Sequence, residues 1–173
     1  YNEKKILNFG LGDVGKNTCK NILEYTNNKN LTLINRTEDK ALKFKKLHPK
    51  ITVKNISELS QEINDTDILI VSTGANFPTI TKGHIKEGKE LLILDLSMPE
   101  NVDISLKKIE GISLVNVDEL SKITDKTIEI RKQEIPIAEG IIEAYKNEFN
   151  DWISYRKFVP AVNALKDSLQ TIQ

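Results

Sequence analysis

Residues 6–15 read Ile6-Leu7-Asn8-Phe9-Gly10-Leu11-Gly12-Asp13-Val14-Gly15, an apolar run that ends in the pattern G-x-G-x-x-G. The apolar run predicts a β-strand, and helical spacing follows the last glycine, so the glycines fall in a turn between strand and helix. In such a turn Gly10 allows a sharp exit from the strand, Gly12 lets the backbone approach a pyrophosphate, and Gly15 lets the helix pack closely on the strand. The free N–H groups at the start of the helix favour negative charge. The stretch therefore predicts a dinucleotide-binding turn, and the alternative is an ordinary connection between a strand and a helix.

Strand-like and helix-like segments alternate through the first 118 residues. Expected strands cover residues 6–9, 31–34, 51–53, 67–72, 91–94 and 113–117. Expected helices cover 14–25, 38–47 and 57–63. The first should have an apolar face of Val14, Thr18, Ile22 and Leu23, and the third should have Ser57 as its N-cap. Continuously apolar strands between helices are typical of a parallel sheet covered on both faces, so we predict an α/β fold with a Rossmann-like doubly wound sheet in the order 3-2-1-4-5-6.

The second strand ends in Asn35-Arg36-Thr37, about 20 residues after Gly15, where an NAD-binding fold usually has an acidic residue for the ribose 2′-hydroxyl. No acidic residue is present there. An adenosine 2′-phosphate would be repelled by a carboxylate, whereas the guanidinium of Arg36 can bind it through charge-assisted hydrogen bonds. We therefore expect NADPH rather than NADH as the cofactor. The alternative is a solvent-facing arginine in an ordinary turn.

Polar residues also follow the fourth and fifth expected strands, at the edge of the sheet where this fold binds its ligand. Ser72, Thr73 and Gly74 offer hydroxyls and close backbone to the nicotinamide half of a dinucleotide, although a simple glycine-containing loop would look the same. Asp95 is as compatible with a structural cap as with a functional carboxylate. The predicted cofactor-binding residues are thus Gly10, Leu11, Gly12, Asp13, Val14, Gly15, Asn35, Arg36, Thr37, Ser72, Thr73 and Gly74.

No set of residues predicts a catalytic or metal site. Cys19 falls on the first expected helix without a base nearby in the sequence, so we interpret it as a small core residue. His48 and His84 have no metal-ligand spacing and are interpreted as structural or surface residues. The chain is expected to hold a hydride carrier and to lack the group that prepares a substrate.

Composition narrows the class of protein further. The 25 basic and 25 acidic residues balance, which gives no support for a basic nucleic-acid groove across the whole domain. A single cysteine excludes an internal disulfide and suits a reducing cytoplasm. No apolar run approaches the ~20 residues of a membrane span. Because the sequence begins at Tyr1 directly before the first strand, we expect it to be an excised piece of a longer protein.

After Asp118 strand signals end, and apolar residues recur at spacings of three and four. One run comprises Ala138, Ile142, Tyr145, Phe149 and Trp152. A second comprises Phe158, Val162, Leu165, Leu169 and Ile172. The runs predict a long C-terminal helix, or two, with a coiled-coil-like seam.

Two prolines interrupt this pattern, and we expect a helix boundary or a kink near both Pro136 and Pro160, because proline has no N–H to donate. We expect residues 1–118 to form the NADP(H)-binding domain and residues 119–173 to form a linker helix. The seam is too long to be buried on that domain, so we expect it to contact a second chain or another part of the protein. The alternative is a helix that folds back on its own sheet.

Taken in order, these motifs resemble the glutamyl-tRNA reductase family over nearly the whole chain. The matching segments are Gly10-Leu11-Gly12-Asp13-Val14-Gly15, Asn35-Arg36-Thr37, Ser72-Thr73-Gly74-Ala75, Ile93-Leu94-Asp95-Leu96-Ser97-Met98-Pro99, Val115-Asn116-Val117-Asp118-Glu119-Leu120, and Ile141-Ile142-Glu143 with Phe149 and Trp152. The related shikimate dehydrogenases share the glycine turn and the N-R-T turn but not the helical tail.

The resemblance implies a three-domain, V-shaped homodimer of tetrapyrrole biosynthesis. In that family a cysteine of the amino-terminal domain attacks the ester of glutamyl-tRNA, and NADPH from the second domain reduces the thioester to glutamate-1-semialdehyde. A long spinal helix then leads to a dimerisation domain, which residues 119–173 would begin. The motif of the catalytic cysteine is absent from this sequence, and Cys19 does not match it. Glu100 stands where the family's arginine is expected, which removes an anion contact there.

Two other functions remain open at this point. One is a shikimate-dehydrogenase-like NADP reductase, whose Lys/Asp catalytic pair would lie in an added amino-terminal domain. The other is a non-catalytic module for nucleotide sensing or assembly, in which the helical seam is the working surface.

Overall fold

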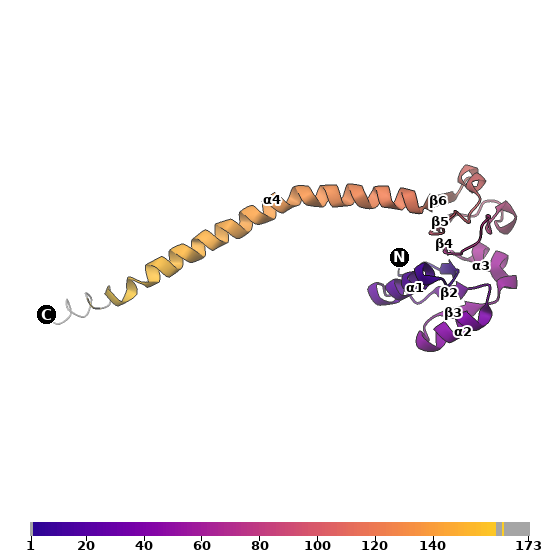
Figure 1. The fold of residues 1–173 in the computed structure, drawn as a ribbon, viewed down its shortest axis with the longest axis horizontal. Helices are drawn as coiled ribbons and strands as arrows, with labels where there is room; N and C mark the ends of the chain where they lie inside the picture. The colour runs from indigo at the N-terminus through magenta and orange to yellow at the C-terminus, as the bar shows by residue number, and fades with distance from the viewer. Residues whose placement is uncertain (1, 162–163, 165–173) are drawn as a thin grey trace. The chain divides into compact units, whose positions relative to one another are not determined.

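The computed structural model describes residues 2–161 and 164. The chain divides into two compact units, Tyr1–Lys122 and Ile123–Gln173. The first unit is built on a six-stranded parallel sheet in the order β3-β2-β1-β4-β5-β6 (Figure 1). The predicted fold class and strand order are therefore confirmed.

The strands follow the expected apolar runs to within one or two residues. They are β1 Ile6–Phe9, β2 Leu31–Ile34, β3 Thr52–Lys54, β4 Ile68–Val71, β5 Leu91–Asp95 and β6 Ile112–Asn116. The α-helices of this unit are α1 Asp13–Tyr25, α2 Glu38–Leu47 and α3 Leu59–Asp65, and the 3-10 helices are η1 Ile56–Glu58, η2 Lys82–His84 and η3 Ile104–Lys108. Strand β1 lies at the centre, with Ile6 paired to Leu31 of β2 and to Ile68 of β4.

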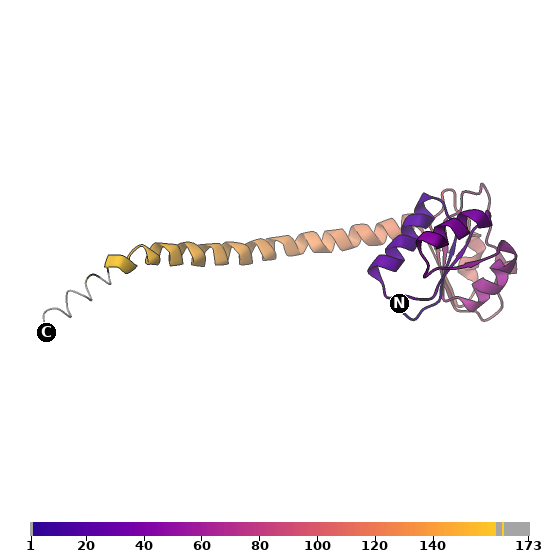
Figure 2. The ribbon, with the colours of Figure 1, turned by 90° about the horizontal axis from the view of Figure 1, so that it is seen from below.

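Helices cover both faces of the sheet, as a doubly wound fold requires (Figure 2). One face packs against α3 through Leu59 and Ile63. The other packs against α1 and α2 through Cys19, Ala41 and Phe44. Each fully buried aliphatic side chain in these layers contributes about 1.5–3 kcal/mol, so the strand positions are strongly fixed by burial.

The predicted apolar face of α1 is confirmed in part, and the predicted N-cap of the third helix is wrong. Ile22 and Leu23 pack against the core, whereas Val14 is 51% exposed, because α1 packs closely at the buried Gly15 and Cys19 and turns Val14 towards solvent. Ser57 is not an N-cap. The side chain of Asn55 accepts from the backbone N–H of Ser57 at 3.0 Å and so caps η1, and η1 leads directly into α3.

Helix α4, Val117–Arg156, begins in the first unit and continues into the second. Its first turn is capped reciprocally, since Asn116 Oδ1 accepts from the Glu119 N–H at 2.9 Å and Glu119 Oε2 accepts from the Asn116 N–H at 3.2 Å. We expected a boundary or a kink near Pro136. The helix has no boundary there, because Pro136 lies inside it, and a kink at this position stays a prediction. Near Pro160 the prediction of a boundary is confirmed, since α4 ends at Arg156 and a turn follows.

The seam of α4 is exposed along the described part of the helix. Ile142, Tyr145, Phe149 and Trp152 are between 53% and 69% exposed. The rings of Phe149 and Trp152 stack at 5.9 Å. Phe158, which follows α4, is 65% exposed, and the predicted seam positions Val162, Leu165, Leu169 and Ile172 lie outside the described residues. Within the described range, no helix has a stretch long and apolar enough to cross a membrane.

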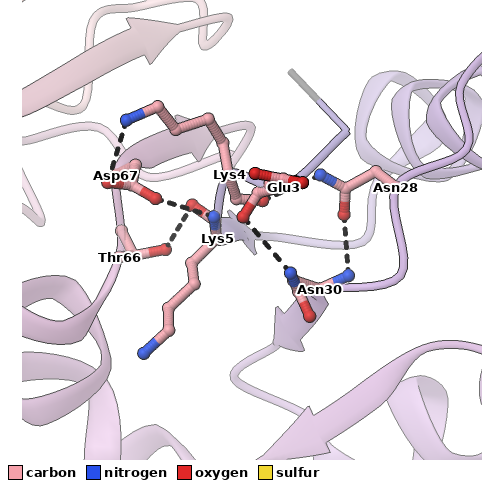
Figure 3. A network of polar contacts seen from close by, with 7 residues as sticks. All are labelled: Glu3, Lys4, Lys5, Asn28, Asn30, Thr66 and Asp67. Atoms are coloured by element: carbon pink, nitrogen blue, oxygen red, sulfur yellow. Dashed lines mark hydrogen bonds and ion pairs between the residues drawn. The ribbon is translucent and has the colours of Figure 1, made fainter.

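A polar network fastens the segment before β1 to the segments that precede β2 and β4 (Figure 3). The backbone N–H of Lys5 donates to Asp67 Oδ2 at 2.8 Å, and the Lys4 ammonium lies 3.5 Å from Asp67 Oδ1. On the other side, Asn28 Nδ2 donates to the Lys4 carbonyl at 2.8 Å. The network thereby joins this segment to the beginnings of β2 and β4.

Acid is expected to weaken this network through Asp67. The hydrogen bond from the Lys5 N–H lowers the pKa of Asp67, so its carboxylate stabilises the fold above pH ~4, and that contribution is lost as the pH falls through the lowered pKa. Asp67→Asn should therefore reduce the free energy of unfolding by about 1 kcal/mol at pH 7 and by much less at pH 3 in urea titrations. Asp125→Asn, a matched change on the exposed surface of α4, should have no effect at either pH. If Asp67→Asn reduced the free energy of unfolding equally at both pH values, the stabilising role of the ionised Asp67 carboxylate would be contradicted.

Candidate cofactor-binding site

The first unit has a cavity of about 210 Å³ at the carboxyl ends of β1, β2 and β4. This edge of a doubly wound sheet is where ligands bind, because the strand order reverses direction beside β1. The residues that line it are Phe9, Gly10, Leu11, Gly12, Asn35, Arg36, Ser72, Thr73, Gly74, Ala75 and Thr79. Eight of the twelve predicted cofactor-binding residues are therefore brought together in one place.

Gly10 and Gly15 are required by the packing of the chain itself. Gly10 has φ +111°, and a Cβ there would lie 2.4 Å from the carbonyl oxygen of Ser72. A Cβ on Gly15 would lie 2.4 Å from the carbonyl oxygen of Gly10. Asn8 supports the same turn from below, because its buried Nδ2 donates to the Gly10 carbonyl at 2.7 Å. Sequence reasoning missed Asn8, although a polar residue inside an otherwise apolar strand is a usable signal.

Gly12 differs from the other two glycines of the motif. Its backbone is extended, with φ −71° and ψ −173°, and any residue can adopt that conformation. A Cβ there would meet no protein atom closer than 3.9 Å. Gly12 lines the cavity and is the N-cap of α1, and no side chain caps the helix. The turn therefore leaves an open cradle beside the uncapped N-terminus of a helix, and this arrangement fits an anionic pyrophosphate.

The turn after β2 is tied to the glycine turn by one side chain. Asn35 Oδ1 accepts from the Leu11 N–H at 3.0 Å, while Asn35 Nδ2 donates to the Thr37 carbonyl at 2.8 Å. Arg36 follows, exposed to solvent, and is the one charged residue among those that line the cavity. A fixed loop thus presents a guanidinium at the rim, with no carboxylate in the lining to compete for it.

The loop after β4 forms the opposite wall. Ser72 Oγ donates to the Gly10 carbonyl at 3.3 Å, so this wall is attached to the glycine turn. The Thr73 N–H donates to Ser97 Oγ at 3.2 Å, and Thr73 Oγ1 donates to Asn101 Oδ1. Sequence reasoning did not identify Ser97 or Asn101, because their partners lie 24 and 28 residues away.

The other four predicted residues do not line the cavity. Asp13 is turned to solvent, where its carboxylate lies 3.6 Å from the Lys16 ammonium, and Val14 is also exposed. Gly15 lies beneath the turn, packed against Gly10. Thr37 contributes its carbonyl to Asn35. For these residues a direct contact with a cofactor remains a prediction.

Asp95 acts as a structural cap. Its buried carboxylate accepts three backbone N–H groups, from Ser97 at 3.0 Å, Asn101 at 2.7 Å and Val102 at 2.9 Å, and so fixes the loop after β5. Glu100, which stands where the resemblance implies an arginine, accepts from Asn116 Nδ2 at 2.6 Å. This carboxylate offers no anion contact.

The remaining candidates are structural. Cys19 is fully buried, and burial raises the pKa of its thiol to about 12, so it is not a nucleophile at neutral pH. The His48 ring packs against Phe44, with ring centroids 4.5 Å apart. His84 Nδ1 accepts from the Thr81 N–H at 3.2 Å within a turn. The described residues contain no group of three or more side chains arranged to hold a metal ion.

Comparisons with solved structures agree with this fold. A glutamyl-tRNA reductase from Methanopyrus kandleri superposes with a TM-score of 0.72 at 24% identity, covering 82% of this chain and 37% of that one. The nucleotide-binding domain of a glutamyl-tRNA reductase from Thermoplasma volcanium superposes with a TM-score of 0.58 at 23% identity, covering 75% of this chain and 86% of that one. At these identities the likeness establishes the fold alone.

Curated sequences give a closer match. A glutamyl-tRNA reductase from Flavobacterium psychrophilum is 49% identical over 172 residues, and one from Christiangramia forsetii is 48% identical over 171. Each match covers 99% of this chain and 41% of the relative, so the chain spans about two-fifths of the relatives it matches. The family model described as shikimate/quinate 5-dehydrogenase matches residues 1–123. The chain therefore belongs to the shikimate/quinate 5-dehydrogenase family, and its resemblance to the glutamyl-tRNA reductases, which extends through the helical tail, is confirmed.

Proposed function

We propose that this chain is the NADPH-binding part of a glutamyl-tRNA reductase, which reduces glutamyl-tRNA to glutamate-1-semialdehyde for tetrapyrrole biosynthesis. Residues 1–118 bind the cofactor, and residues 119–173 form the spinal helix and the start of a dimerisation domain. The observation that carries the proposal is Gly12, a glycine that faces the cavity and that the chain's own packing does not require. The 49% identity to a curated reductase supports the choice of reaction.

Each part of the cavity suits one part of NADPH. The glycine turn and the start of α1 hold the pyrophosphate through backbone N–H groups. Arg36 binds the adenosine 2′-phosphate, because its guanidinium forms charge-assisted hydrogen bonds to the negatively charged phosphate oxygens. Ser72, Thr73 and Gly74 line the wall beside the nicotinamide half. When bound, the reduced nicotinamide supplies a hydride.

This chain alone is expected to bind cofactor and to catalyse nothing. Its single cysteine is buried, with a raised pKa, so no thiolate is available to accept the glutamyl group. The glutamyl-tRNA and its nucleophile would be held by an amino-terminal domain of the whole protein, and the helical region would join two such chains in the cytoplasm. Product formed from charged tRNA by residues 1–173 alone would refute this division of labour.

A second candidate is supported by the exposed seam of α4, which is typical of an assembly surface. In that case the chain would self-associate without using a dinucleotide. Two measurements separate these functions. Nicotinamide fluorescence during a titration with NADPH reports cofactor binding, and sedimentation reports self-association. Saturable binding supports the reductase function, whereas strong self-association without binding would favour the assembly module.

A further inference from the structure

Asn101 lies behind the cavity wall and connects the loop after β4 to the loop after β5. It is fully buried and does not line the cavity. Its Oδ1 accepts from Thr73 Oγ1 and from the Ala75 N–H at 3.2 Å, and its Nδ2 donates to the Ala75 carbonyl at 2.8 Å. The amide therefore holds both backbone groups of Ala75, as a paired strand would.

The backbone of Asn101 is also fixed on the opposite side. Its N–H donates to Asp95 Oδ2 at 2.7 Å, and its carbonyl accepts from the N–H groups of Thr79 at 2.8 Å and Ile80 at 3.1 Å. Asp95 ends β5, so the position of Asn101 is set by the sheet. Asn101 thereby connects the end of β5 to a loop with no regular secondary structure of its own.

The residues that Asn101 holds face the cavity. Thr73, Ala75 and Thr79 all line it, and each bonds to the side chain or backbone of Asn101. These three residues belong to the wall formed by the β4 loop, away from Arg36 on the β2 loop. A shift of this loop would change the shape of one half of the cavity and leave the glycine turn in place.

We propose that Asn101 is a positioning residue for the nicotinamide half of the dinucleotide. This inference rests on the proposed function. Asn101 acts through Thr73, Gly74 and Ala75, which it holds in the conformation that contacts the nicotinamide ribose and ring. The amide carries its acceptor and its donors on two separate atoms, which reach the N–H and the carbonyl of Ala75 together. Alanine has neither group, and serine has a single hydroxyl on a shorter side chain, so neither replaces it.

The test compares two ligands on the same variant by calorimetry. NADPH spans the whole cavity, whereas 2′,5′-ADP contains only the adenosine half with its phosphates. Asn101→Ala should weaken NADPH binding about ten-fold and leave the affinity for 2′,5′-ADP within about two-fold. Asn101→Ser, a smaller polar change, should show the same selectivity. A general loss of structure would weaken the binding of both ligands alike.

A matched control is available at Asn64. Its side chain also joins two segments by three hydrogen bonds, donating to the carbonyls of Ser60 at 2.6 Å and His84 at 2.9 Å and accepting from the Lys86 N–H at 2.8 Å. None of these residues lines the cavity. Asn64→Ala should lower thermal stability without changing the affinity for either ligand.

Amide hydrogen exchange tests the same inference on the unaltered chain, so it does not depend on any variant folding. The Ala75 N–H, which bonds to Asn101 Oδ1, should exchange about ten-fold more slowly with NADPH bound and unchanged with 2′,5′-ADP bound. Equal protection by the two ligands, or equal loss of both affinities in Asn101→Ala, would overturn the inference. If the unaltered chain bound neither ligand, the proposed function would fail first, and the inference with it.

Discussion

Gly12→Ala is expected to weaken NADPH binding about a hundred-fold while the chain stays folded. The new Cβ would meet no protein atom within 3.9 Å, and the backbone at φ −71° suits alanine, so the fold loses only the N-cap preference, about 1 kcal/mol or less. The same methyl would occupy the space through which the pyrophosphate approaches the backbone. A loss of about 2.7 kcal/mol of binding free energy corresponds to that hundred-fold change.

The measurement is a calorimetric titration with NADPH, combined with a urea titration of the same sample. Gly140→Ala is the matched control, because it adds a methyl to α4, where nothing lies within 4 Å of the new atom. It should leave NADPH binding unchanged and stabilise the helix slightly. Unchanged NADPH affinity in Gly12→Ala would show that no ligand passes close to this glycine.

Gly15→Ala, the same substitution three residues later, should instead destabilise the fold itself. Its Cβ would lie 2.4 Å from the Gly10 carbonyl oxygen and 2.5 Å from Ser72 Oγ, and the backbone carbonyl cannot move aside as a flexible side chain can. Helix α1 would have to move away from the sheet, which would disturb the packing of the fully buried Cys19. We expect a loss of about 3 kcal/mol in the free energy of unfolding.

Urea unfolding at pH 7 measures this loss directly, with Gly12→Ala as the internal comparison. Thiol labelling gives a second readout, because the thiol of Cys19 should react with iodoacetamide faster in Gly15→Ala once α1 is displaced. If Gly15→Ala were as stable as the unaltered chain, the close packing of helix on strand at this glycine would be wrong.

The strands were predictable from the sequence because burial on both faces leaves an apolar run that turn residues interrupt. β1 and β2 fall on the predicted residues for this reason. β3 begins one residue late, because the Ile51 N–H still bonds to the His48 carbonyl in the preceding turn, although Ile51 itself is buried. The apolar side chain of Ile51 predicts that the residue is buried, but it does not predict whether the backbone joins the hydrogen bonds of the sheet.

Helix boundaries depended on single polar groups and were less predictable. Asn55 and Ser57 are both good caps by residue type, and only the geometry of the turn selects Asn55. Pro136 removes one donor from α4 without ending it, because the turns on either side still form their own hydrogen bonds. The sequence indicates the missing donor but not whether its neighbours tolerate the loss.

The candidate site divides in the same way. The glycine turn was predictable because its residues are adjacent in the sequence and each glycine has a distinct structural reason. The residues that support the β4 loop were not predictable, because Ser97 and Asn101 follow β5 and reach that loop only when β4 and β5 lie side by side. No spacing in the sequence encodes that contact.

The claim that NADPH binds across the glycine turn, with its 2′-phosphate on Arg36, is tested most directly by a calorimetric comparison of NADPH and NADH. The unaltered chain should prefer NADPH by about ten-fold or more, and Arg36→Ala should lose that preference by weakening NADPH alone. Arg156→Ala, which removes a positive charge from α4, should retain the preference for NADPH. Equal affinities of the unaltered chain for NADPH and NADH, unchanged by Arg36→Ala, would contradict the account.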